Sequence, residues 1–119
     1  MTVCLFAAGK ALSLGAAALT LAWTHSVEKS RWEEDWLLTD AGLQIVAARV
    51  KGSGAGMEPA EGALLLDGWW RWKPDLPPQA ELVLAASGAT GEGWTICAAG
   101  ECRIVGQDPA KPVVLRACP

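Results

Sequence analysis

The chain has 119 residues and a formal net charge of −3, from 13 acidic and 10 basic side chains. This length is enough for one core, and we expect a single β domain over residues 1–119. The basic residues are scattered, which argues against a nucleic-acid-binding surface. Seven tryptophans stand beside one phenylalanine and no tyrosine. Because tryptophan is a large apolar side chain, we expect most of the seven to lie in the core.

Residues 1–23 are apolar enough to look like an export signal. Two details favour β-strands instead: no basic residue precedes the apolar stretch, and Lys10 lies inside it. The uncharged run from Ala11 to Thr24 is also shorter than the about 18 residues that a membrane span needs. We therefore expect one or two retained strands here, with a signal peptide as the alternative.

Along most of the chain, apolar side chains recur at every second position, and Gly, Pro, Asp and Ser interrupt the pattern. Such alternation is typical of an all-β domain. We expect about nine short antiparallel strands that form a β-sandwich or a partly closed β-barrel. The alternation alone does not distinguish between these two architectures.

Two ionisable side chains interrupt apolar alternations in neighbouring strands. His25 continues the apolar face of the strand expected over residues 19–27, and Glu34 lies on the apolar face of the strand over 32–38. Burying such groups without a partner costs several kcal/mol by rough estimate. We therefore expect each of the two side chains to have a structural or functional reason to be buried, such as pairing with the other.

A tight hairpin at residues 29–30 would bring these two groups together. In that register His25 faces Glu34 and Trp23 faces Trp36, so apolar residues also face one another. The predicted pair is interpreted either as an internal contact that fixes the register or as a ligand or partner site. A hydrolase that uses His25 and Glu34 is a third reading, but Ser26 points to the opposite face from His25.

The clearest long loop starts with the glycines of residues 52–56, next to Lys51. The glycines are interpreted as allowing positive φ or a close approach of the backbone. The alternative is a small-anion site formed by free backbone N–H groups beside the lysine, although the loop lacks the ending of a phosphate-binding loop. Further along, Asp67-Gly68 predicts a type I′ hairpin turn that pairs Leu66 with Trp69. In this hairpin Trp69 shares its face with charged residues, so it is the candidate for an exposed aromatic side chain.

The four cysteines predict two disulfides, Cys97–Cys102 across a hairpin and Cys4–Cys118 between the chain ends. These bonds favour an oxidising compartment; the alternative is four reduced thiols in a cytosolic protein. The Cys-x4-Cys spacing has no second pair and is loose for zinc, so we expect no metal site.

Several of these segments resemble a bacterial and archaeal family known as domain of unknown function 1850. The resemblance is carried by residues 23–29, Glu34 and Trp36, and the glycine-rich stretch 49–56, with weaker support from 67–69. The chain departs from the family pattern at two loop positions, where it has Arg31 and Ser53.

The resemblance implies a small β-rich domain whose genes lie beside those of tripartite ATP-independent periplasmic (TRAP) transporters of the TAXI type. It implies no established activity, and therefore no catalytic residues and no cofactor. The recurring family positions correspond to these residues of the chain: His25, Ser26, Glu28, Glu34, Lys51, Gly54 and Gly56.

We therefore expect a non-enzymatic accessory or interaction module of a solute transporter, in the periplasm or cell envelope. Its expected partners are the transporter's membrane subunit or solute receptor, and a small anionic ligand. We expect no nucleic acid, and membrane association only through a partner. The alternative is a carbohydrate- or small-anion-binding β-sandwich with exposed tryptophans, and the alternative compartment is the cytoplasm.

Overall fold

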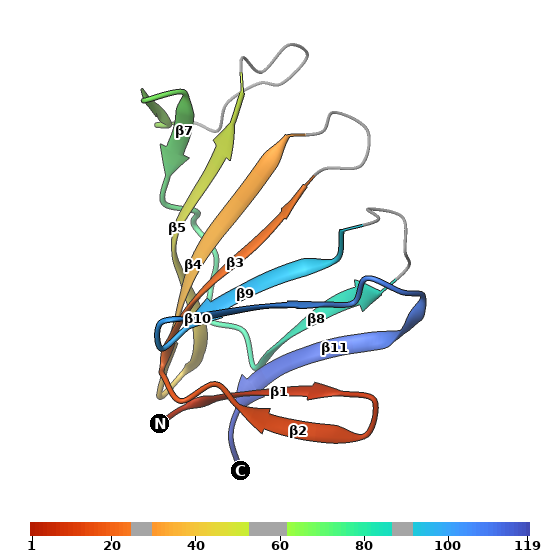
Figure 1. Ribbon diagram of the computed structural model, residues 1–119. Helices are drawn as coiled ribbons and strands as arrows, with labels where there is room; N and C mark the ends of the chain where they lie inside the picture. The colour runs from red at the N-terminus through yellow and green to blue at the C-terminus, as the bar shows by residue number, and fades with distance from the viewer. Residues whose placement is uncertain (25–29, 53–61, 87–91) are drawn as a thin grey trace.

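The computed structural model describes residues 1–24, 30–52, 62–86 and 92–119. Within these ranges eleven β-strands form two antiparallel sheets, and no helix is present (Figure 1). The sheets are open at their edges and pack face to face. The all-β prediction is confirmed, and the architecture is the sandwich rather than the barrel, with more strands than the about nine expected.

The smaller sheet has four strands and contains both ends of the chain. Its order is β2 (Lys10–Ser13), β1 (Val3–Ala7), β11 (Ala110–Ala117) and β8 (Glu81–Ala86). The apolar N-terminal stretch therefore forms the two strands β1 and β2, as the alternation predicted. The predicted Cys4–Cys118 disulfide is present and joins β1 to the residue after β11.

The larger sheet has seven strands. Its order is β10 (Glu101–Val105), β9 (Trp94–Ala98), β3 (Ala18–Thr24), β4 (Arg31–Thr39), β5 (Gly42–Lys51), β7 (Trp69–Trp72) and β6 (Leu64–Leu66). The predicted Cys97–Cys102 disulfide links β9 to β10. The β6–β7 hairpin has the predicted turn, because Leu66 pairs with Trp69 and Asp67 and Gly68 have φ values of 52° and 83°.

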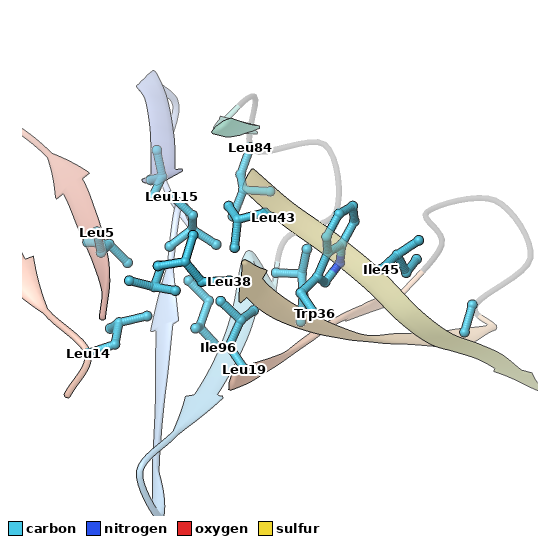
Figure 2. Close-up of a cluster of buried hydrophobic side chains, with 14 residues drawn as sticks. Leu5, Leu14, Leu19, Trp36, Leu38, Leu43, Ile45, Leu84, Ile96 and Leu115 are labelled. Atoms are coloured by element: carbon cyan, nitrogen blue, oxygen red, sulfur yellow. The ribbon is translucent and has the colours of Figure 1, made fainter. Parts of the chain in front are cut away.

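The core lies where the two sheets approach each other. Figure 2 shows leucines of the four-stranded sheet packed against apolar side chains of β3, β4, β5 and β9. The labelled core residues are Leu5, Leu14, Leu19, Trp36, Leu38, Leu43, Ile45, Leu84, Ile96 and Leu115. By contrast, β7 lies far from β1 and β2 (Figure 1). The four-stranded sheet therefore covers only part of the inner face of the seven-stranded sheet.

The pairing of β3 with β4 differs from the predicted register. Trp23 lies opposite Trp32 rather than Trp36, a shift of four residues, and Glu34 lies opposite Leu21 rather than His25. An even shift keeps the same side chains on the inner face, so the alternation does not distinguish the two registers. The observed register allows the indoles of Trp23 and Trp32 to stack.

The segment between β7 and β8 is fixed to the edge of the core. Gln79 forms an isolated bridge with Leu43, with N···O distances of 2.7 and 2.8 Å in the two directions. Gly42 makes this close approach feasible, since a Cβ there would lie 2.6 Å from the carbonyl oxygen of Gln79. The bridge fixes the connection beside the start of β5.

Candidate functional site

A cleft of about 340 Å³ lies between the two sheets. Strands β3, β4 and β9 form one wall, and β8 with the preceding connection forms the other. The residues that matter for its chemistry are Trp23, Glu34, Trp36, Gln79, Leu82 and Trp94. Its volume lies in the usual range of small-molecule sites, and its lining is mostly apolar with a few polar groups.

A row of four indoles crosses the inner face of the seven-stranded sheet, and two of them line the cleft. In order along the row they are Trp94, Trp23, Trp32 and Trp72. Trp94 packs against Trp23 at 5.2 Å between ring centroids with a tilt of 54°. Trp23 stacks on Trp32 at 6.1 Å with 9° between planes, and Trp32 meets Trp72 edge-on at 6.1 Å. These contacts hold Trp23 and Trp94 in fixed orientations at the cleft, because each ring is supported by a neighbour.

Glu34 is the ionisable group on the same wall. Its Oε1 accepts a hydrogen bond from Trp36 Nε1 at 3.0 Å. Burial raises the pKa of Glu34, and the hydrogen bond from Trp36 offsets part of that rise. Glu34 therefore lies in an apolar environment in which its negative charge is poorly stabilised.

The ionisable side chains among the described residues that line the cleft are all acidic. The other one besides Glu34 is Glu81, which lies 3.7 Å from Arg116 in an exposed ion pair. Among the described residues that line the cleft, none is a lysine, arginine or histidine. The cleft therefore favours a ligand that is neutral or positively charged over an anion.

Trp32 carries a further polar atom on the inner face. Its Nε1 is buried and has no hydrogen-bond partner in the described part of the protein. A buried donor without a partner costs about 1–3 kcal/mol. The indole row thus contains one N–H group whose hydrogen-bonding capacity is unused.

The outer face of the same sheet carries a separate polar network centred on Arg49. Arg49 Nε lies 2.7 Å from Glu33 Oε1, and Arg49 Nη1 lies 2.9 Å from Asp35 Oδ2. Thr20 donates to Asp35 at 2.8 Å. Burial acts to raise the pKa of Asp35, but hydrogen bonds from Arg49 and Thr20 together with nearby positive charge lower it overall.

The structure separates the predicted site residues that it describes. Glu34 points into the cleft, whereas Lys51 and Trp69 lie on the outer face, with Lys51 Nζ 5.6 Å from the centroid of the Trp69 ring. Trp69 is half-buried. The remaining predicted positions lie outside the described residues: His25, Ser26, Glu28, Gly54 and Gly56.

No pattern in the sequence connects Glu34 with Trp94, Leu82 or Gln79. Trp94 begins a predicted strand, but nothing local indicates that β9 pairs with β3 or that β8 belongs to the opposite sheet. The relevant feature of the sequence is the frequency of tryptophan on the apolar faces. This frequency predicts that the tryptophans lie in the core and does not predict a cleft wall.

The two disulfides bear on the compartment of the protein. Both predicted bonds are present, and no cysteine is free. Disulfides of this kind form and persist in oxidising environments, so the protein belongs outside the reducing cytoplasm. No helix in the described ranges has the length and apolar character to span a bilayer.

Comparison with protein families gives a match over most of the chain. The family described as Domain of unknown function (DUF1850) matches residues 19–104. Every described residue that lines the cleft lies in this segment, whereas β1, β2 and β11 lie outside it. No curated protein and no solved structure shows a significant match. The cleft is therefore built from the part of the chain that the family shares.

Proposed function

The chain belongs to the DUF1850 family, and from this membership we propose that it is a non-enzymatic accessory module of a TAXI-type TRAP transporter. In this role it binds a ligand or partner through the cleft between its two sheets. The observation that carries the binding role is the indole-walled cleft itself, with Glu34 on its wall. Its position within the family-matched segment supports a role common to the family.

The chemistry of the cleft supports binding rather than catalysis. The described lining offers two carboxyl groups and one amide but no serine, threonine, cysteine or histidine that could act as a nucleophile or its base. Glu34 is held by an indole N–H, and no second titratable group among the described residues bonds to it. This arrangement suits a fixed polar contact for a bound group.

We place the module in the periplasm or cell envelope. The two disulfides support this placement, because they require an oxidising environment for their formation. A solute transporter of the TRAP class also presents its receptor on that side of the membrane. Any membrane association would then pass through the partner.

Affinity capture tests the transporter role. The tagged full-length chain is expected to retain the transporter's membrane subunit or its solute receptor. Trp94→Ala should reduce capture, because Trp94 lines the cleft, whereas Trp69→Ala on the outer face should not. Near-ultraviolet circular dichroism checks that both variants are folded. Failure of the wild-type chain to retain either subunit would remove the transporter role.

Carbohydrate binding is the second candidate function. The flat indoles of Trp23 and Trp94 both line the cleft, and amphipathic rings of this kind provide rigid contact area for a sugar ring. Titration with neutral mono- and disaccharides, followed by tryptophan fluorescence, tests it. Saturable binding that Trp94→Ala weakens would support this role, and unchanged fluorescence would remove it.

A further inference from the structure

We propose that the cleft between the sheets binds a small organic cation, specifically a substituted ammonium group with an apolar body. This inference deepens the proposed binding role of the cleft and rests on it. Three features of the cleft support it: the charge of the lining, the orientation of two indoles and the hydrogen bonding of one carboxyl group.

The charge of the lining selects a cation. Glu34 and Glu81 are the ionisable groups of the cleft among the described residues, and Arg116 offsets the charge of Glu81 from outside the cleft. Within the described part of the chain Glu34 has no such partner, since its hydrogen bond comes from the neutral indole of Trp36. A positive charge beside Glu34 would therefore meet an uncompensated carboxylate.

The indoles supply the second attraction. Trp23 and Trp94 meet at 54° with centroids 5.2 Å apart, so their planes form a corner rather than a flat stack. A cation held against an aromatic face is attracted by the ring quadrupole, and the attraction grows when water is excluded. Both rings line the same cleft as Glu34, so the two attractions act on one ligand.

The hydrogen bond from Trp36 holds the Glu34 carboxyl group in position on the wall of the cleft. The indole N–H holds Glu34 Oε1 and leaves Glu34 Oε2 without a recorded partner in the described protein. Burial raises the pKa of Glu34, and a bound cation would favour the ionised form again. Ligand binding and ionisation of Glu34 are therefore coupled.

The rest of the lining defines the class of cation. Leu21, Leu82 and Leu84 contribute apolar surface, which a bare metal ion does not use. A hard divalent cation needs about six oxygen ligands, whereas the cleft offers chiefly indole and aliphatic surface. A volume of about 340 Å³ fits a free small molecule better than a protein segment.

Isothermal titration of the full-length oxidised chain with matched probes tests the charge requirement. The cationic probes are choline, tetramethylammonium and benzyltrimethylammonium chloride. The control for choline is 3,3-dimethylbutan-1-ol, which has the same shape without the charge, and sodium chloride corrects for ionic strength. At least one cation should bind, and the neutral alcohol should bind about tenfold more weakly than choline. Equal binding of the charged and neutral shapes, or no binding of any cation, would overturn the proposal.

Two matched carboxyl variants locate the site. Glu34→Gln removes the negative charge but keeps an oxygen that can accept from Trp36, and it should weaken cation binding about tenfold. Glu33→Gln removes the same charge from the same strand on the opposite face, where Glu33 pairs with Arg49, and should change binding less than about twofold. Equal effects of the two substitutions would place the cation elsewhere. Thermal unfolding confirms that both variants are folded.

The result separates this inference from the proposed function. Cation binding by the isolated chain, together with failure to capture any transporter subunit, would leave the ligand class intact and remove the transporter role. Saccharide binding without cation binding would leave the cleft as a binding site and remove the ammonium assignment.

Discussion

Trp36 donates its indole N–H to the carboxylate of Glu34, two residues earlier on the same face of β4, at 3.0 Å. The bond connects the core to the cleft: Trp36 is a core residue that is 4% exposed, and Glu34 lines the cleft. It therefore fixes a carboxyl group in apolar surroundings by means of a rigid side chain.

Replacing Glu34 with Gln should stabilise the protein at high pH and have little effect at low pH. The pKa of Glu34 in the folded state is raised above its ordinary value of 4.5 by burial. The folded state therefore holds the proton more tightly than the unfolded chain, and stability is lost as the pH rises through the folded pKa. The Gln variant does not titrate and avoids this loss.

Thermal unfolding at about pH 3.5 and about pH 8 measures the effect. The difference in Tm between Glu34→Gln and wild type should be near zero at the lower pH and positive at the higher one. Glu101→Gln, whose side chain is 77% exposed, serves as the control for a charge change. A Gln variant that is less stable than wild type at the higher pH would contradict the argument.

Replacing Arg49 with Met should destabilise the protein by about 1–2 kcal/mol at neutral pH. The substitution leaves Glu33 and Asp35 without the cation that lies 2.7 and 2.9 Å from their oxygens. We expect a loss of stability no larger than this, because the Asp35 side chain is 35% exposed and water weakens the interactions of exposed charges. Urea unfolding measures the loss.

The same variant should also flatten the acid limb of the stability curve. Arg49 helps to lower the folded pKa of Asp35 below its ordinary value of 3.8, so wild type loses this contribution as the pH falls through the folded pKa. Arg49→Lys is the matched control, since it keeps the charge but not the forked geometry. If Met and Lys at this position give the same stability at every pH, the charge of Arg49 is not what stabilises the network.

The two disulfides should contribute unequally to stability. Cys4 and Cys118 are separated by 114 positions, whereas Cys97 and Cys102 are separated by five. A crosslink that closes a long loop removes more entropy from the unfolded chain, so replacing the first pair by serine should cost about 3–5 kcal/mol and the second about 1–2 kcal/mol. Urea unfolding of the two double variants tests the order. A larger loss for the hairpin bond would refute the entropic argument.

Gly42→Ala should be more destabilising than Gly68→Ala, although both glycines have positive φ. A Cβ at Gly42 would meet the Gln79 carbonyl oxygen at 2.6 Å, whereas a Cβ at Gly68 meets nothing within 4 Å. We expect a loss of about 1 kcal/mol at Gly68 from the backbone alone and about 2–3 kcal/mol at Gly42. Chemical denaturation compares the two variants, and equal losses would show that the close approach is relieved at little cost.

Features set by local chemistry were predictable from the sequence. Asp67-Gly68 predicts a turn with two positive φ values, and a two-residue turn of this type requires Leu66 to pair with Trp69. The disulfide between Cys97 and Cys102 follows from the same logic, because a tight hairpin places them in facing positions. In both cases a few adjacent residues determine the geometry.

Features that depend on long-range pairing were not predictable in the same way. The residues between β3 and β4 include no strong turn dipeptide, and registers that differ by an even number keep the same faces inward. A register shift in the β4–β5 pairing leaves Val46 without a partner and was not signalled by the alternation. The cleft depends on the position of β9 beside β3, which only the assembled sheet defines.

The Cys4–Cys118 bond has a mechanical consequence. Thr2 accepts a hydrogen bond from the Cys118 N–H at 2.9 Å, so the ends of the chain leave the sandwich side by side (Figure 1). A pulling force applied at both termini would be carried by the covalent bond and would not reach the strands enclosed by it. The oxidised protein could therefore be tethered through linkers at both ends while its sheets, and the cleft between them, remain unloaded.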